Sequence, residues 1–490
     1  KLFLSFYNGA DYGESNKNLV FGATYEKTSF TTNATELNKT GWGNSATVLR
    51  WNHIFSGKAF SNLTLDYDNY FYNNQVQRVE TYTVQGASDN STTKYLYSIK
   101  SDSKIERKGM SYDLSFPFGD KHNINAGFHL AIFSLSPISQ SDNDSLNIRN
   151  SLKKYRSIES TPYIEDRINL ANSLELKLGL NHFLIIAGNK TYSTLLPRIS
   201  SVLKISENLS INAAYIEMGQ NIQLLSHNRI SLSSDLWVPV TETIKPQYSK
   251  QMSAGFTLDL PFNLVFRSTG FYKNMYNLLA YKEGAVFDNS IGWAEQVTNG
   301  EGHSYGIDMM LERSSGRLSG WLSCTWSRSF RKFENLNNGN EFPFRYDRPI
   351  DIKTALMYNI NSWIDASAIW VFSSGSVETV GNMAYVSNFD KGSPKYSNIS
   401  SNITYGENIT VYSYNALRIP AYHRMDISCN FHFNKPRVKS TLSIGAYNVY
   451  NHKNPYSVTL NRLWINRYYY SLDYQSLFGI IPYINYSFNF

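Results

Sequence analysis

The chain has 490 residues, 15% of which are aromatic, and tyrosine alone occurs 36 times. No run of about 18 apolar residues occurs in it, which excludes helical membrane spans. The net charge of +7 comes from 46 basic and 39 acidic residues scattered along the chain, so no nucleic-acid partner is indicated. Two classes remain: a membrane barrel with aromatic girdles, and a large soluble all-β protein such as a propeller.

The first third of the chain alternates predicted strands with tight turns and polar loops. The predicted strands are residues 1–8, 44–55, 59–72, 94–118 and one around 124–130. Tight turns are predicted at Ser56-Gly57-Lys58 and Gly119-Asp120-Lys121. The predicted polar loops are 9–43, with a small hairpin at 18–26, the stretch between 72 and 94, and 136–157.

The same rhythm continues to the C-terminus. Further strands are predicted at 161–168, 174–186, 193–205, 209–218 and, last, 477–490. Tight turns are predicted at 172, 206–208, 261–263, 315–317, 361–362 and 434–437. The long connections are 220–246, 278–301, 330–345, 375–420 and 451–476. Tight turns on one rim and long loops on the other are typical of an outer-membrane barrel, whereas a propeller needs a repeat of roughly 40 residues that this chain lacks.

Alternating side chains support the barrel. In the last strand, Phe478, Ile480, Ile484, Tyr486 and Phe488 share one face, and the chain ends on Phe490. The opposite faces of other strands carry charged residues that would each cost several kcal/mol in lipid. We expect these residues to face a wet or protein-filled lumen, solvated or in ion pairs: Asp66, Asp68, Asp308, Glu312, Lys353, Asp365, Arg424 and Asp426.

The sequence thus predicts an all-β transmembrane antiparallel β-barrel with about 18 strands, short periplasmic turns and long extracellular loops. Cys324 and Cys429 lie in strands that are not neighbours, so no disulfide is expected. No P-loop, dinucleotide fingerprint, HExxH or GxSxG motif with plausible partners occurs, and the nine histidines form no close pair at metal-ligand spacing. We predict no enzyme, no catalytic or metal site and no cofactor.

Binding is the remaining function, and the long loops on the rim are the expected place for it. The loop at 221–246 holds the weak candidates Trp237, His227 and Arg229. Aromatic and amide side chains in such loops suit a glycan, a siderophore or a peptide equally. Packing of the closed loops alone is the alternative explanation for each of the three residues.

Several stretches resemble the barrel of TonB-dependent outer-membrane receptors, especially those of Bacteroidota. They run in family order across essentially the whole chain: residues 196–239, 303–312 (HSYGIDMMLE), 342–352 (FPFRYDRPIDI), 419–427 (IPAYHRMDI), 447–456 (YNVYNHKNPY) and the terminal Phe490. The resemblance implies a 22-stranded barrel occluded by an N-terminal plug. We therefore expect residues 1–490 to be the barrel domain, with the plug and the first four strands outside this chain.

The resemblance also implies a function and partners. The protein would import a scarce nutrient (a siderophore, glycan, peptide or cofactor) across the outer membrane with energy delivered by TonB. Expected partners are TonB through the absent N-terminal part, outer-membrane lipid and lipopolysaccharide, and the barrel-insertion machinery through Phe490; a surface lipoprotein is left open. The alternative is a passive 18-stranded porin or a structural platform for partner proteins, and electrical conductance distinguishes the two.

Overall fold

The structure is a computed structural model. It describes residues 1–25, 28–55, 59–85, 90–142, 154–225, 236–283, 293–379, 383–388, 405–410, 414–435, 438–464 and 468–489. Cys324 and Cys429 are free, as predicted.

Among these described residues, one antiparallel sheet of 19 strands makes up most of the molecule. Its first half consists of β1 (Leu2–Tyr25), β2 (Thr28–Phe55), β3 (Ala59–Gln85), β4 (Asn90–Phe118), β5 (His122–Asp142), β6 (Tyr155–Ala171), β7 (Leu174–Ala187), β8 (Lys190–Lys204) and β9 (Leu209–Gln220). The second half consists of β12 (Gln247–Leu260), β13 (Leu264–Tyr281), β14 (Val297–Arg313), β15 (Leu318–Phe333), β16 (Phe342–Pro343), β17 (Ile350–Asn359), β18 (Ile364–Ser373), β23 (Tyr422–Lys435), β24 (Val438–Tyr447) and β27 (Ile481–Asn489). Without the two-residue β16, the count is the predicted 18.

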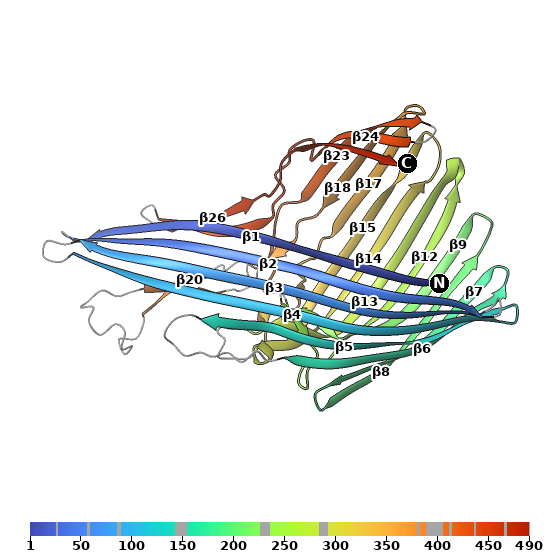
Figure 1. Ribbon diagram of the computed structural model, residues 1–490, viewed down its shortest axis with the longest axis horizontal. Coiled ribbons are helices and arrows are strands. Elements are labelled where there is room, and N and C mark those ends of the chain that lie inside the picture. Colours follow the sequence, from blue (N-terminus) through green and yellow to red (C-terminus); the bar gives the residue numbers. More distant parts are fainter. Residues whose placement is uncertain are drawn as a thin grey trace.

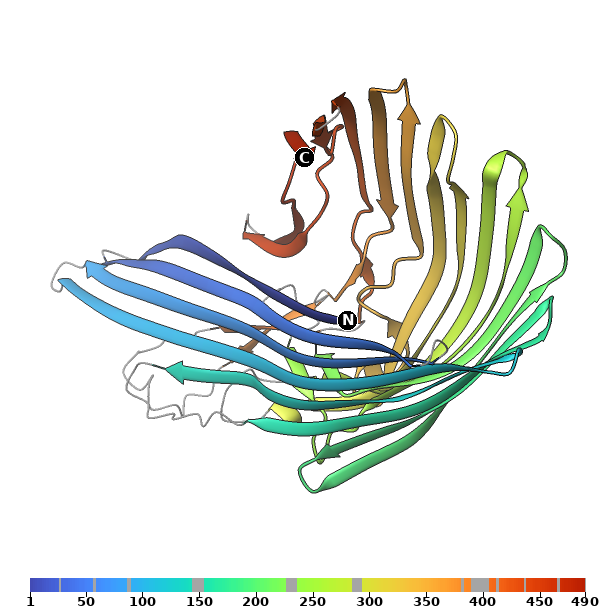
Figure 2. The ribbon, with the colours of Figure 1, turned by 45° about the vertical axis from the view of Figure 1, so that its right-hand side comes forward.

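Neighbours in the sheet follow chain order, so the sheet is an up-and-down meander. It curls around an interior, and its two edges are β1 and β27, with no pairing between them among the described residues (Figure 2). The tight turns predicted at Gly119-Asp120-Lys121, 172, 206–208, 261–263, 315–317 and 361–362 all connect strands on the same rim. The predicted turns at 56–58 and 434–437 lie wholly or partly outside the described residues.

The first strands are much longer than predicted. β1 and β2 pair continuously from Leu2 opposite Trp51 to Tyr25 opposite Thr28, so the predicted loop over 9–43, with its hairpin at 18–26, is wrong. At about 3.3 Å per residue, these strands extend roughly 80 Å, far beyond a bilayer. Outside the bilayer both faces of a strand meet water, so its side chains are polar on both faces, as they are in a loop. Pairing with the neighbouring strand nevertheless satisfies the backbone N–H and C=O groups here. Figure 1 shows β1–β4 projecting as a long sheet.

The same error recurs at two other places. Strand residues extend into the stretch between 72 and 94 and into the predicted loop at 136–157. The C-terminal strand is instead shorter than predicted, because β27 begins at Ile481 rather than at 477. Before it, the backbone N–H of Ile480 donates to Asn451 Oδ1 at 3.0 Å instead of joining the sheet. Phe490 lies outside the described residues.

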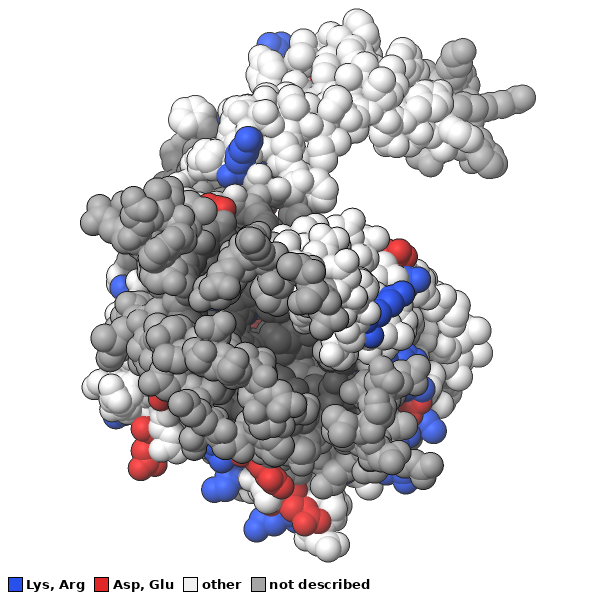
Figure 3. Space-filling view, turned by 90° about the vertical axis from the view of Figure 1, so that its left-hand side faces the viewer, with Lys and Arg blue, Asp and Glu red and all other residues white. Residues whose placement is uncertain are grey.

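The last strand exposes large apolar side chains on the face that the alternation predicted for lipid, with Ile484 75% and Phe488 57% accessible. Every one of the eight predicted inward charges has a polar partner. The pairs are Arg107 with Asp66 and Asp68, Arg267 with Glu312, Lys353 with Asp351, His432 with Asp365, Arg424 with Asp426, and Thr325 with Asp308. Figure 3 shows acidic and basic side chains interspersed rather than gathered in one patch.

Shorter elements lie between the long strands on the other rim. They are β10 (Ile222–Leu225), β11 (Leu236–Pro239), β19 (Val377–Glu378), β20 (Met383–Asn388), β21 (Tyr405–Thr410), β22 (Leu417–Arg418), β25 (Ser457–Trp464) and β26 (Tyr468–Gln475), with single 3₁₀ turns at η3 (Trp293–Glu295) and η4 (Asn337–Gly339). A further 3₁₀ turn, η2 (Pro261–Asn263), forms the tight turn between β12 and β13 on the first rim. Two of these elements, β10 and β11, position the candidate site.

Candidate ligand-binding cavity

The hairpin of β10 and β11 crosses the interior of the curled sheet. It contacts β5 and β6 on one side and β13 on the other. In the sheet, β6 and β13 are separated by β7, β8, β9 and β12. Only a segment that spans the interior can contact both groups of strands, so the hairpin lies across the barrel.

Apolar side chains fix the hairpin at both ends. Leu225 and Val238 are fully buried and pack with Val297 at the start of β14. On the other side, Ile222 packs against Phe133 and Leu135 of β5. Each fully buried Leu or Val contributes about 1.5–3 kcal/mol, so this packing is enough to hold the hairpin in place.

Buried side-chain amides form hydrogen bonds that orient the hairpin. Gln223 is fully buried; its Nε2 donates to the carbonyl oxygen of Lys245 at 2.9 Å, and its Oε1 accepts from Gln247 Nε2 at 2.9 Å. Asn221 Nδ2 donates to Ser157 Oγ of β6 at 3.2 Å. Because a buried amide without a partner is costly, these bonds specify one placement of the hairpin.

A second segment folds over the interior after β15 and is fixed by Asp347. The Asp347 carboxylate is fully buried and accepts hydrogen bonds from the backbone N–H of Ser329 at 2.8 Å and from Arg418 Nη2 at 2.7 Å. It also lies 3.3 Å from Arg328 Nε. One carboxylate thus ties the segment at 342–347 to β15 and to β22.

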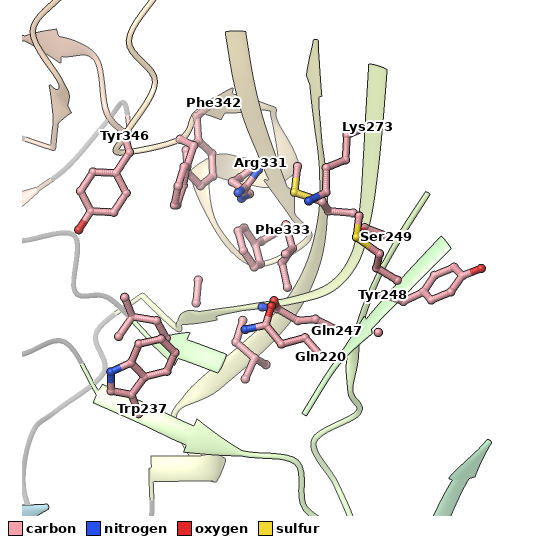
Figure 4. Close-up of a pocket in the computed structure, with 18 of the residues that line it drawn as sticks. Gln220, Trp237, Gln247, Tyr248, Ser249, Lys273, Arg331, Phe333, Phe342 and Tyr346 are labelled. Carbon is pink, nitrogen blue, oxygen red and sulfur yellow. The ribbon is translucent and has the colours of Figure 1, made fainter. Parts of the chain in front are cut away.

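A cavity of about 470 Å³ lies between the hairpin and this segment (Figure 4). Trp237 of β11 lies on one side, and Phe333 and Phe342 lie across from it, with Gln220 and Gln247 between them. Lys273 of β13 and Arg331 of β15 lie on the wall above the amides, whereas the Tyr248 ring points away from the cavity. The wall therefore combines apolar rings, carboxamides and two cationic groups.

Two glycines of β14 make room for the side chains of β15. Gly300 pairs with Phe333, and Gly302 pairs with Arg331. A Cβ atom at 302 would lie 2.9 Å from Arg331 Nη1 and 2.5 Å from the Phe330 carbonyl oxygen, and a Cβ at 300 would clash with the Phe333 ring. Glycine at both positions is therefore what lets these side chains occupy the cavity wall.

The Arg331 guanidinium is held at one edge. Its Nη1 donates to the carbonyl oxygen of Phe330 at 2.9 Å and to Ser329 Oγ at 3.3 Å. The group also lies 4.1 Å from the centroid of the Phe344 ring, which is within the range of a cation–π contact. The guanidinium is thus oriented before any ligand arrives.

The three residues proposed from the sequence have different outcomes. Trp237 lines the cavity and is 38% exposed. His227 and Arg229 fall at 226–235, outside the described residues. Sequence reasoning missed Lys273, Arg331, Phe333 and Phe342, because 278–301 and 330–345 were predicted as long connections and only the structure places Gly300 and Gly302 inside β14.

In the part of the chain that the structure describes, no three His, Cys, Asp or Glu side chains gather at a spacing that could hold a metal ion. No helix there is both long and apolar enough to cross a membrane.

Residues 3–449 match the family model described as "TonB dependent receptor-like, beta-barrel". No curated protein matches the chain significantly.

Solved structures share the fold at low sequence identity. The FrpB iron transporter from Neisseria meningitidis is 10% identical over 99% of this chain and 81% of that one, with a TM-score of 0.54. P. aeruginosa FpvA bound to heterologous pyoverdines is 11% identical over 99% and 71%, with a TM-score of 0.51. The siderophore receptor PirA from Acinetobacter baumannii is 12% identical over 90% and 74%, with a TM-score of 0.50.

Proposed function

Since this chain belongs to the TonB-dependent receptor β-barrel family, we propose that it captures a nutrient in the cavity beside Trp237 and passes it through the barrel. It is an outer-membrane transport protein and not an enzyme, and the family implies an interaction with TonB. The observation that carries the proposal is the hairpin of β10 and β11, which crosses the interior and forms one side of a cavity with polar and aromatic walls.

The chemistry of the wall supports capture of a small solute. Carboxamides and cations supply hydrogen-bond donors, and aromatic rings supply flat apolar contact, the usual composition of a small-molecule site. Siderophore, glycan, peptide and cofactor remain the candidate substrates. FrpB is an iron transporter and PirA is a siderophore receptor, so a ferric chelate is the first substrate to test.

Passive diffusion is the alternative. A hairpin held across the interior by fully buried Leu225 and Val238 does not favour an open pore. The presence of a plug and four more strands upstream of Lys1 is still a prediction. The sequence that precedes Lys1 would test it.

Uptake in cells tests the proposal. A strain lacking the gene is compared with wild type for growth at limiting concentrations of a panel of ferric chelates, oligosaccharides, peptides and cobalamin. We expect one substrate to require the receptor, and its labelled form to accumulate only in cells that also have TonB. Accumulation that depends on the receptor but persists without TonB would establish a passive pore instead.

A further inference from the structure

Two cationic side chains share one wall of the cavity. Lys273 comes from β13 and Arg331 from β15, with only β14 between them. Both are partly buried, and the charge of Arg331 acts repulsively on Lys273. Like charges brought together in a partly desolvated place raise the free energy of the folded protein unless something offsets them.

No carboxylate in the described part of the chain offsets them. Within that part, no Asp or Glu oxygen lies within 4.0 Å of Lys273 Nζ or of the Arg331 guanidinium, and neither group is among the ion pairs. The neighbouring arginines are different. Arg328 and Arg418 share Asp347, at 3.3 Å and 2.7 Å, and Arg345 lies 3.7 Å from Glu378. Lys273 and Arg331, which have no carboxylate partner among the described residues, therefore place two positive charges on the cavity wall.

The wall is also built to keep these cations in place. Gly302 leaves the space that the Arg331 side chain uses, and Phe344 and the Phe330 carbonyl oxygen orient its guanidinium. A guanidinium held at one edge retains N–H donors on its other edge, and these suit a planar oxyanion. Phe333 and Phe342 lie beside it with their rings stacked at 6.1 Å.

We infer that the cavity selects a small anion that carries carboxylate-type oxygens on a flat apolar frame, with Lys273 and Arg331 as its charge partners. Trp237, Phe333 and Phe342 would contact the frame. This inference rests on the proposed function for its biological meaning, since it names the class of nutrient captured. The binding itself is tested without transport.

A matched pair of probes separates charge from shape. The full-length receptor, purified in detergent, is titrated by calorimetry with benzene-1,3,5-tricarboxylate and with the uncharged benzene-1,3,5-tricarboxamide. We expect the tricarboxylate to bind at least about ten-fold more tightly, with a preference that shrinks as salt is raised, because the interaction is between charges.

Variants assign that preference to the two side chains. Lys273→Gln and Arg331→Gln should each weaken tricarboxylate binding about five- to ten-fold and leave triamide binding unchanged. Lys332→Gln removes the same charge from the exposed neighbour of Arg331 and should change neither affinity. Gly302→Val, which keeps both charges but fills the space beneath Arg331, should weaken tricarboxylate binding as well. Heat-modifiable migration in gels confirms that each variant is a folded barrel.

The outcomes separate this inference from the proposed function. Equal binding of the two probes by wild type, or unchanged binding by folded Lys273→Gln and Arg331→Gln variants, would overturn the inference. If cellular uptake then still required the receptor and TonB, transport would stand with a neutral substrate. Selective tricarboxylate binding with uptake that does not need TonB would keep the anion site and remove active transport.

Discussion

At the scale of single residues, Asp347 determines where the segment after β15 lies. Its carboxylate has no solvent exposure and is surrounded by two guanidinium groups and one backbone N–H. Separation of buried charges from their partners is costly, whereas exposed ion pairs contribute little. Asp347 therefore matters more to this segment than any ion pair on the exposed strands.

We predict that Asp347→Asn releases the segment while the barrel stays folded. The amide keeps the shape but leaves Arg328 and Arg418 without a carboxylate in the described part of the chain, and breaking such a buried pair costs about 3–5 kcal/mol. Limited trypsin digestion should cut after Arg345 at least about ten-fold faster than in wild type. Asp259→Asn, an exposed position at the end of β12, should leave the cleavage rate unchanged; equal rates for both variants would contradict the assignment.

At the scale of elements, the hairpin of β10 and β11 depends on a few buried contacts. Its strands have four residues each, too few to be stable alone, so docking supplies the stability. Leu225 is fully buried in the cluster with Val238 and Val297, whereas the adjacent Leu224 is 38% exposed and lines the cavity. The two leucines give a matched pair with the same chemistry and opposite environments.

We predict that Leu225→Ala loosens the hairpin and Leu224→Ala does not. The loss of a buried leucine side chain costs about 2–5 kcal/mol, and here the cost falls on the docking of the hairpin. Hydrogen exchange of the amides paired between β10 and β11 should be at least about ten-fold faster in Leu225→Ala. Exchange in β24, next to the edge strand β27, serves as the internal reference; a uniform increase there would mean that the whole barrel has been destabilised.

Individual strands show how much of the fold could be predicted from the sequence. β7 and β9 were predicted almost to the residue, because one face of each is apolar over most of its length, interrupted only by His182 in β7 and Glu217 in β9. Residues 9–25 of β1 and 28–43 of β2 were not predicted as strand, because apolar and polar side chains stop alternating where both faces of the strand leave lipid. Trp237 was proposed from loop composition alone. Lys273 and Arg331 could not be paired from the sequence, since only the register of β13, β14 and β15 brings them together.

At the scale of the whole molecule, the meander predicts a wide interior, and the segments folded into it decide whether that interior conducts ions. Eighteen long strands would enclose an aqueous channel if nothing filled it. The hairpin, held at β5 on one side and at β13 on the other, is one such obstruction. Hence the conductance of the full-length receptor measures how completely its interior is filled.

We predict that wild-type receptor in a planar bilayer has almost no steady conductance, and that replacing residues 222–239 by a short Gly-Ser linker raises it. The deletion removes the buried contacts of Leu225 and Val238 together with Trp237, so the interior widens on the side of β5. Leu224→Ala, which trims one side chain of the cavity, should remain closed. A steady open pore in the wild type would instead support the porin alternative. A hairpin with a conducting passage beside it could not retain a captured solute for transport driven through TonB.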